Sequence, residues 1–175
     1  DQLTQLPNRE LFYDRLQLAL TTAGREQSQF ALLYLDLDKF KQINDNYGHH
    51  IGDELLQHTA QRILSCLRSS DTVARFGGDE FVILLQQVDS EDLALLLAEK
   101  IRQALNQPFV LANNSLQVQP SVGIALYPQH SNEAQALMRS ADNAMYLAKK
   151  AGGNRIMLSG AAVVKHRVTT PGEPV

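Results

Sequence analysis

Short apolar runs alternate along the chain with longer stretches in which apolar and polar residues are mixed. The clearest run, residues 30–35, is almost continuously apolar, which is typical of a central strand buried on both faces. Two further apolar segments, 72–74 and 81–85, flank a Gly-Gly pair and predict a β-hairpin. The remaining expected strands cover residues 109–111, 116–125 and 155–158.

The mixed stretches predict helices between these strands. Residues 53–67 place their leucines and isoleucines on one face, as an amphipathic helix does. Ser90 is a good helix-starting residue for a helix that continues to about residue 105. The other expected helices cover residues 7–22, 40–47 and 132–150. Strands that alternate with helices around one buried strand indicate a single α/β domain over residues 1–158, followed by a tail or linker at 159–175.

Length, charge and cysteine content narrow the possible partners. The 175 residues suffice for one domain, and the net charge of −3 predicts no nucleic-acid partner. The single cysteine, Cys66, excludes an internal disulfide and is consistent with a cytoplasmic domain. No apolar stretch approaches the roughly 20 residues that span a bilayer, so we expect no membrane contact by this domain. Because the chain starts with Asp1, we expect it to be part of a longer protein that could carry a membrane anchor.

Candidate chemistry is concentrated at the predicted hairpin tip. Gly77 and Gly78 permit positive φ angles and the close approach of a ligand to the backbone. Asp79 and Glu80 follow directly, and a divalent cation would relieve the repulsion between their charges. Taken alone, the segment is better explained as a simple turn.

A second acidic element strengthens the hypothesis of a metal site. Asp36 and Asp38 follow the buried strand at 30–35, and a carboxylate there is costly unless it is paired or bound to metal. The alternative is a helix cap or an ion pair with Lys39 or Lys41. Together the two acidic elements could supply oxygen ligands to Mg²⁺ from different strands.

At this point the sequence resembles a known family. The segment from Gly77 to Phe81 is identical to the motif that names the GGDEF domains, the bacterial diguanylate cyclases. Residues 1–9 look like the family's opening D-x-L-T-G-L-P-N-R, with Gln5 in place of glycine. Residues 36–53, 121–125 and 141–149 match further family blocks in the same order.

The resemblance implies a fold and a reaction. The fold would be the palm-like nucleotidyl-cyclase sandwich, a mixed and mostly antiparallel central sheet flanked by helices. The reaction would condense two GTP molecules into cyclic di-GMP and two pyrophosphates. It would require Mg²⁺ or Mn²⁺ and a homodimer, because each domain holds one GTP.

Site residues are implied by position in the same way. Asp36, Asp79 and Glu80 would be catalytic residues and, with the carbonyl of Leu37, metal ligands. The residues implied to contact substrate are Asn44 and Asp53 at guanine, Lys41 and Lys149 at the triphosphate, and His49, Gly77 and Gly78 around them. Without the resemblance, Asn44 could equally be a turn residue and Asp53 a helix cap, and Lys149 would be a cation at a helix end.

Arg68 and Asp71 match the family's R-x-x-D inhibitory site, at which product binds. The alternative for this pair is an arginine that ends a helix and an aspartate in the following turn. The sequence departs from the family at Gln5 and at Gly153, where an arginine or lysine often stands; either change could lower activity or be compensated locally.

Two alternatives to a cyclase therefore stay open. One is a catalytically silent GTP-binding domain that regulates an attached EAL phosphodiesterase, since the late motifs look similar to those of GGDEF–EAL composites. The other is a receptor that binds cyclic di-GMP only through Arg68 and Asp71. Attached sensor domains are possible partners in each case.

Overall fold

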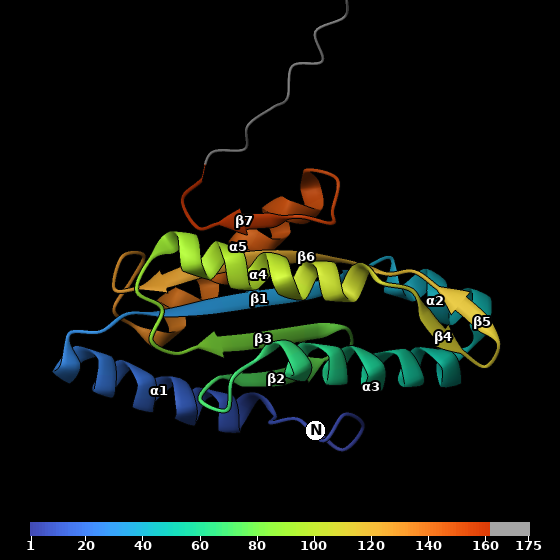
Figure 1. Ribbon diagram of the computed structural model, residues 1–175, viewed down its shortest axis with the longest axis horizontal. Coiled ribbons are helices and arrows are strands. Elements are labelled where there is room, and N and C mark those ends of the chain that lie inside the picture. The colour runs from blue at the N-terminus through green and yellow to red at the C-terminus, as the bar shows by residue number, and fades with distance from the viewer. Residues whose placement is uncertain (162–175) are drawn as a thin grey trace, which may run out of the picture.

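The computed structural model of the protein describes residues 1–161 (Figure 1). Its helices are α1 (Arg9–Glu26), α2 (Phe40–Tyr47), α3 (His49–Cys66), α4 (Glu91–Asn106) and α5 (Ala134–Lys150). Its strands are β1 (Phe30–Asp38), β2 (Thr72–Gly77), β3 (Glu80–Leu85), β4 (Phe109–Leu111), β5 (Asn114–Leu116), β6 (Gln119–Tyr127) and β7 (Ile156–Leu158). Most of the predicted tail, residues 162–175, lies outside the described residues. Within residues 1–161, no helix combines the length and apolar character that crossing a membrane requires.

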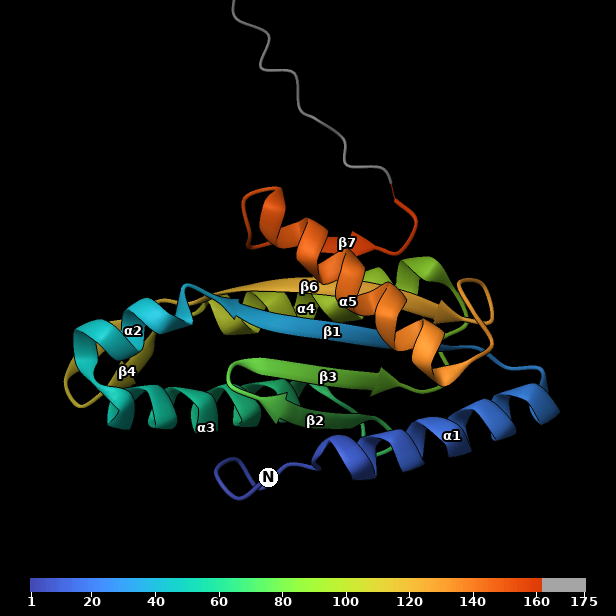
Figure 2. The same cartoon turned by 180° about the vertical axis from the view of Figure 1, so that it is seen from behind.

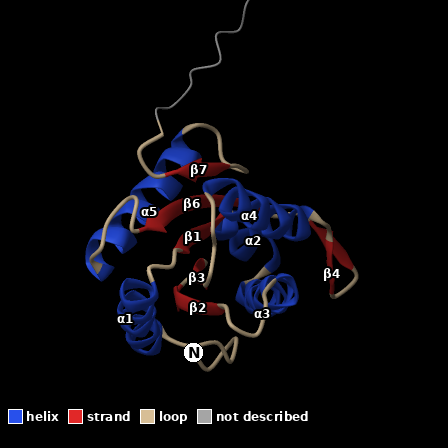
Figure 3. Cartoon of the chain, turned by 60° about the vertical axis from the view of Figure 1, so that its left-hand side comes forward, coloured by secondary structure: helices blue, strands red, loops and turns tan. Residues whose placement is uncertain are grey.

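Five strands form one sheet in the order β2-β3-β1-β6-β7. Neighbouring strands are antiparallel except β6 and β7, which are parallel. Strands β4 and β5 form a separate hairpin. Helices α1 and α5 cover one face of the sheet, and α3 and α4 cover the other (Figures 2 and 3). The predicted mixed, mostly antiparallel sheet flanked by helices is confirmed.

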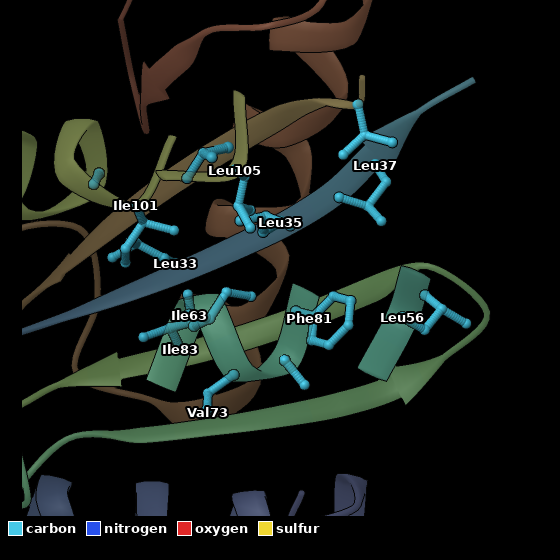
Figure 4. Close-up of a cluster of buried hydrophobic side chains, with 14 of the residues drawn as sticks. Leu33, Leu35, Leu37, Leu56, Ile63, Val73, Phe81, Ile83, Ile101 and Leu105 are labelled. Carbon is cyan, nitrogen blue, oxygen red and sulfur yellow. The ribbon is translucent and has the colours of Figure 1, made fainter. Parts of the chain in front are cut away.

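The hydrophobic core has two parts because side chains of a strand alternate between its faces. Leu33, Leu35 and Leu37 of β1 belong to the cluster beneath α3 and α4 (Figure 4). Leu32 and Tyr34 belong to the cluster beneath α1 and α5. This two-sided burial explains why the segment is apolar at almost every position.

Several boundaries differ from the sequence-based expectations. Strand β1 continues to Asp38, beyond the apolar run, because β6 pairs with it through Asp38 and β3 pairs with it as far as Asp36. Helix α3 begins four residues earlier than expected, directly after Gly48, whose φ of 88° separates it from α2. The single strand expected at 116–125 is divided between β5 and β6, which pair with different partners. Helix α1 begins at Arg9 and continues one turn beyond the expected end.

Candidate active site

A row of polar side chains crosses the centre of the sheet. Asp36 of β1 lies opposite Glu80 of β3 on one side and opposite Ser121 of β6 on the other. Directly opposed residues point to the same face of a sheet. Their neighbours Leu35, Phe81 and Val122 pack into the core beneath α3 and α4, so the row faces α1 and α5.

Asp36 is the buried centre of this row, with 8% of its surface exposed. Nζ of Lys149 lies 2.6 Å from its Oδ1, at the end of α5. Within residues 1–161 that oxygen makes no hydrogen bond of regular geometry, so the contact acts as an ion pair. Burial raises the pKa of Asp36 to about 7; the Lys149 contact opposes this, and the nearby Asp79 adds to it. The alternative of an ion pair with Lys39 or Lys41 therefore does not hold for Asp36, whose partner is Lys149.

The hairpin tip brings Asp79 toward this row. Gly77 and Gly78 have φ angles of 135° and 50°, values that residues with a side chain rarely adopt. Nε of Arg75 donates to the carbonyl of Gly78 at 2.8 Å, and its Nη1 lies 3.0 Å from Oδ1 of Asp1. Arg75 thus connects the tip to the start of the chain. We missed this residue, although its place just before the glycines was a signal.

Glu80 is hydrogen-bonded to Tyr34, which lies on the same face of the sheet. The Tyr34 hydroxyl donates to Oε2 of Glu80 at 3.1 Å. Burial and the Glu80 carboxylate raise the pKa of Tyr34 above its ordinary range. Asp142 of α5 lines a cavity together with Tyr34, and burial and the charge of Asp36 raise the pKa of Asp142. Neither Tyr34 nor Asp142 was singled out from the sequence.

Asp38 is held by the loop that precedes β7. Its Oδ1 accepts from the Ser121 hydroxyl at 2.7 Å, and its Oδ2 accepts from the backbone N–H of Asn154 at 2.8 Å. Gly153 is buried against the same carboxylate with a φ of 73°. A side chain at position 153 would meet both backbone strain and Asp38, which explains the glycine there.

Helices α2 and α3 present the residues expected at guanine. Oδ1 of Asn44 is buried and, among residues 1–161, has no hydrogen-bond donor. The amide lies over Gly52, where a Cβ would overlap it. Asp53 follows one residue later and is exposed. An unpartnered acceptor beside an exposed carboxylate suits a ligand that carries N–H donors.

Lys41 and His49 lie at the starts of α2 and α3 and are exposed. Helix α2 and the turn between β2 and β3 lie toward the same end of the molecule (Figures 1 and 2). The fold therefore gathers the predicted metal and base residues at one end, although they come from four separate segments.

Arg68 and Asp71 already contact each other. Asp71, with 2% of its side chain exposed, accepts from the backbone N–H groups of Arg68 at 2.9 Å and Gln86 at 3.1 Å. The Arg68 guanidinium donates to the carbonyl of Gln86 at 2.6 Å and stays half exposed. The pair thus has the turn-forming role that we weighed, and the exposed face of Arg68 remains open to solvent.

The donor set fits a hard divalent cation. No group of three or more His, Cys, Asp or Glu residues within residues 1–161 is arranged to hold a metal by itself. Asp79 is nevertheless close enough to Asp36 to raise the pKa of Asp36, and both side chains offer oxygen atoms as ligands. Mg²⁺ is commonly bound by one or two carboxylates together with water and substrate phosphates.

Comparison with known proteins finds relatives in sequence and in fold. The family profile described as "Diguanylate cyclase, GGDEF domain" matches residues 1–155. The chain is 47% identical over 154 residues to the bifunctional diguanylate cyclase/cyclic di-GMP phosphodiesterase MucR of Pseudomonas aeruginosa, covering 88% of this chain and 22% of MucR.

Two solved structures share the fold. The GGDEF domain of TpbB from Pseudomonas aeruginosa superposes with a TM-score of 0.89 at 42% identity, covering 91% of this chain and 99% of that one. The GGDEF domain of DgcB from Caulobacter crescentus, in complex with c-di-GMP, gives 0.84 at 30% identity, covering 92% and 93%. The chain spans 22% of MucR and 36% of the full TpbB sequence.

Proposed function

The chain belongs to the GGDEF family of diguanylate cyclase domains, and on that premise we propose that it condenses two GTP molecules into cyclic di-GMP with release of two pyrophosphates. The observation that carries this proposal is the buried Asp36 beside Asp79 and Lys149. A costly carboxylate pair of this kind has a clear use where a metal–triphosphate complex binds.

In this proposal, Asp36, Asp79 and the carbonyl of Leu37 hold Mg²⁺ or Mn²⁺, with Glu80 as a further ligand or charge. When bound, the ion would neutralise charge on the phosphates and lower the pKa of the attacking hydroxyl. The 3′-oxygen of one GTP bonds to the α-phosphorus of the other, and pyrophosphate leaves. In this scheme Asp79 also helps to accept the hydroxyl proton, a role that the metal shares by lowering the pKa of that hydroxyl.

The remaining residues bind and orient substrate. Asn44 and Asp53 recognise guanine, whose N1–H and amino group are donors that adenine lacks as a pair. Lys149, which contacts Asp36 in the metal-free protein, would bind the triphosphate in the loaded site, and Lys41 would add a second cation. His49, Gly77 and Gly78 border the nucleotide, and the glycines let it approach the hairpin backbone.

Catalysis requires a homodimer in this scheme. Each chain offers one set of base-recognition residues, so the two reacting nucleotides meet only when two chains face each other. Turnover per chain should then rise with protein concentration up to the dimer dissociation constant.

The test is direct. The domain is incubated with GTP and Mg²⁺, and cyclic di-GMP is sought by chromatography and mass spectrometry, with Asp79→Asn as the control. Product from the wild type alone supports the proposal. Tight GTP binding without product, even at high protein concentration, would refute it and favour a silent domain that regulates an attached phosphodiesterase.

We also propose product inhibition through Arg68. Its half-exposed guanidinium can pair with a phosphate of cyclic di-GMP while Asp71 holds the turn. The inhibitory contact would thus rest mainly on the arginine, because the carboxylate is already occupied.

A further inference from the structure

Tyr34 brings a hydroxyl group into the buried part of strand β1. The apolar run at 30–35 otherwise consists of Phe, Ala and Leu, so Tyr34 carries the only polar side-chain group in that run. The residue is 6% exposed. A tyrosine hydroxyl that leaves water on folding needs a hydrogen-bond partner. Here the partner is Oε2 of Glu80, at 3.1 Å.

The register of the strands makes this contact possible. Tyr34 lies opposite Val82, and Glu80 lies two residues before Val82 on β3. Tyr34 and Glu80 are therefore diagonal neighbours on the face of the sheet that also carries Asp36. Diagonal neighbours are about 7–8 Å apart, a distance that an aromatic and a long side chain can bridge together. The hydrogen bond thus holds the carboxylate that lies directly opposite Asp36.

Aromatic packing fixes the position of the Tyr34 ring. The ring of Phe76, just before the hairpin glycines, meets the Tyr34 ring edge-on, with the two centroids 6.1 Å apart. Phe12 of α1 meets Phe76 edge-on at 5.5 Å, and Tyr13 stacks on Phe76 at 6.2 Å. A tyrosine side chain has only two χ angles, so this packing leaves its hydroxyl in one place. Tyr34 is therefore a rigid donor beneath the hairpin.

Glu80 has a longer side chain in a less enclosed place. It is partly exposed and begins β3 directly after the hairpin tip. A glutamate that is free to rotate loses much rotamer entropy when it is fixed by a ligand. The bond from Tyr34 occupies Oε2 and leaves the second carboxylate oxygen, Oε1, available to a cation. Carboxylates that ligate metals are commonly held by such a hydrogen bond.

We infer that Tyr34 is a positioning residue, whose hydroxyl holds Glu80 ready as an oxygen ligand of the divalent cation. The inference rests on the proposed metal site at Asp36 and Asp79, but it concerns binding of the metal–nucleotide complex and not the chemical step. The cation itself favours the ionised form of Glu80. The neutral hydroxyl adds direction and no charge, so its contribution should depend on the presence of the cation.

The experiment measures how much Mg²⁺ strengthens the binding of a nucleotide. An α,β-methylene analogue of GTP is titrated by calorimetry, once with Mg²⁺ and once in EDTA. The proteins are the wild type, Tyr34→Phe, Glu80→Ala and the double variant. Tyr13→Phe is the matched control, because it removes a hydroxyl from the same aromatic cluster. The melting temperature of each protein in EDTA establishes that it is folded.

Loss of a residue that holds a metal ligand typically costs 10- to 100-fold in metal affinity. Because Tyr34→Phe keeps the ring, the gain in affinity from Mg²⁺ should fall roughly 10- to 100-fold while the affinity in EDTA stays the same. Glu80→Ala should lose at least as much of the gain. Adding Tyr34→Phe to Glu80→Ala should cause no further loss, since no carboxylate remains to be held. Tyr13→Phe should match the wild type under both conditions.

A purely structural role for Tyr34 would weaken binding equally with Mg²⁺ and in EDTA, and that result would overturn the inference. An undiminished gain from Mg²⁺ in Tyr34→Phe, or no such gain in the wild type, would also overturn it. So would a further loss when Tyr34→Phe is added to Glu80→Ala. A wild type that shows the gain but forms no cyclic di-GMP refutes the cyclase proposal and leaves the inference about Tyr34 standing.

Discussion

Asp36→Asn should stabilise the metal-free protein while it removes activity. The substitution keeps the shape of the side chain and takes one negative charge from a buried row. In the wild type, burial raises the pKa of Asp36 from 3.8 to about 7, with Lys149 opposing and Asp79 reinforcing the shift. The ionised carboxylate is therefore a cost to the fold, which asparagine removes.

The direction in which stability changes with pH follows from proton binding. Between pH 4 and 7 the folded state holds a proton on Asp36 that the unfolded state has released, so the free energy of unfolding falls as pH rises through this range. The interval from 3.8 to about 7 corresponds to about 4 kcal/mol at higher pH. This cost already includes the contact with Lys149, which lowers the pKa of Asp36, so asparagine should recover most of it. For a chain of this size, about 4 kcal/mol corresponds to about 8–16 °C in melting temperature.

Urea denaturation at pH 5 and pH 8 in the presence of EDTA measures this effect. The wild type should lose stability between the two values, Asp36→Asn should lose less, and the variant should be the more stable protein at pH 8. Asp14→Asn, at an exposed position of α1, is the control for removal of a surface charge. With Mg²⁺ and GTP added, the wild type should gain stability by mass action and the variant should not.

A lower free energy of unfolding for Asp36→Asn than for the wild type, at pH 8 in EDTA, would refute this prediction. The same dependence of stability on pH in both proteins would refute it as well. Either result would mean that Lys149 stabilises the charged carboxylate more than burial and Asp79 destabilise it.

Three further outcomes are expected. Asp53→Ala should reduce discrimination against ATP by about tenfold or more in a competition assay, because a carboxylate acceptor at guanine is lost; unchanged discrimination would remove it from the base site. Arg75→Met should lower the free energy of unfolding by about 1–3 kcal/mol through the lost bond to Gly78, measured in urea, and equal stability would contradict this. Arg68→Ala should weaken calorimetric binding of cyclic di-GMP roughly 10- to 150-fold and relieve inhibition at an unchanged initial rate. Equal affinity of the wild type and Arg68→Ala for cyclic di-GMP would leave Arg68 with only its structural contact with Gln86.

The sequence alone was sufficient for features that depend on neighbouring residues. An uninterrupted apolar run predicted the doubly buried β1, because burial on both faces removes the usual alternation. The glycine pair predicted the hairpin tip, since its φ angles of 135° and 50° exclude most side chains. The order of motifs from Asp1 to Lys149 identified the family, which the profile match over residues 1–155 confirmed.

Helix and strand ends were less predictable because long-range pairing decides them. Nothing local shows that β1 continues through two aspartates, since its extension depends on pairing with β6 as far as Asp38 and with β3 as far as Asp36. Similarly, the division of residues 116–125 arises because β5 and β6 pair with different strands.

The environment of the site was decided only by tertiary structure. Asp38 accepts from Asn154, 116 residues away, and Arg75 contacts Asp1, 74 residues away. Lys39 and Lys41 were alternative ion-pair partners for the carboxylate at the end of the strand, but the packing of α5 on the sheet supplies Lys149 to Asp36. The chain determines which carboxylates exist and where strands form, because those are local properties. Which charge meets which carboxylate depends on strand order and helix packing, and these are set by burial across the whole domain.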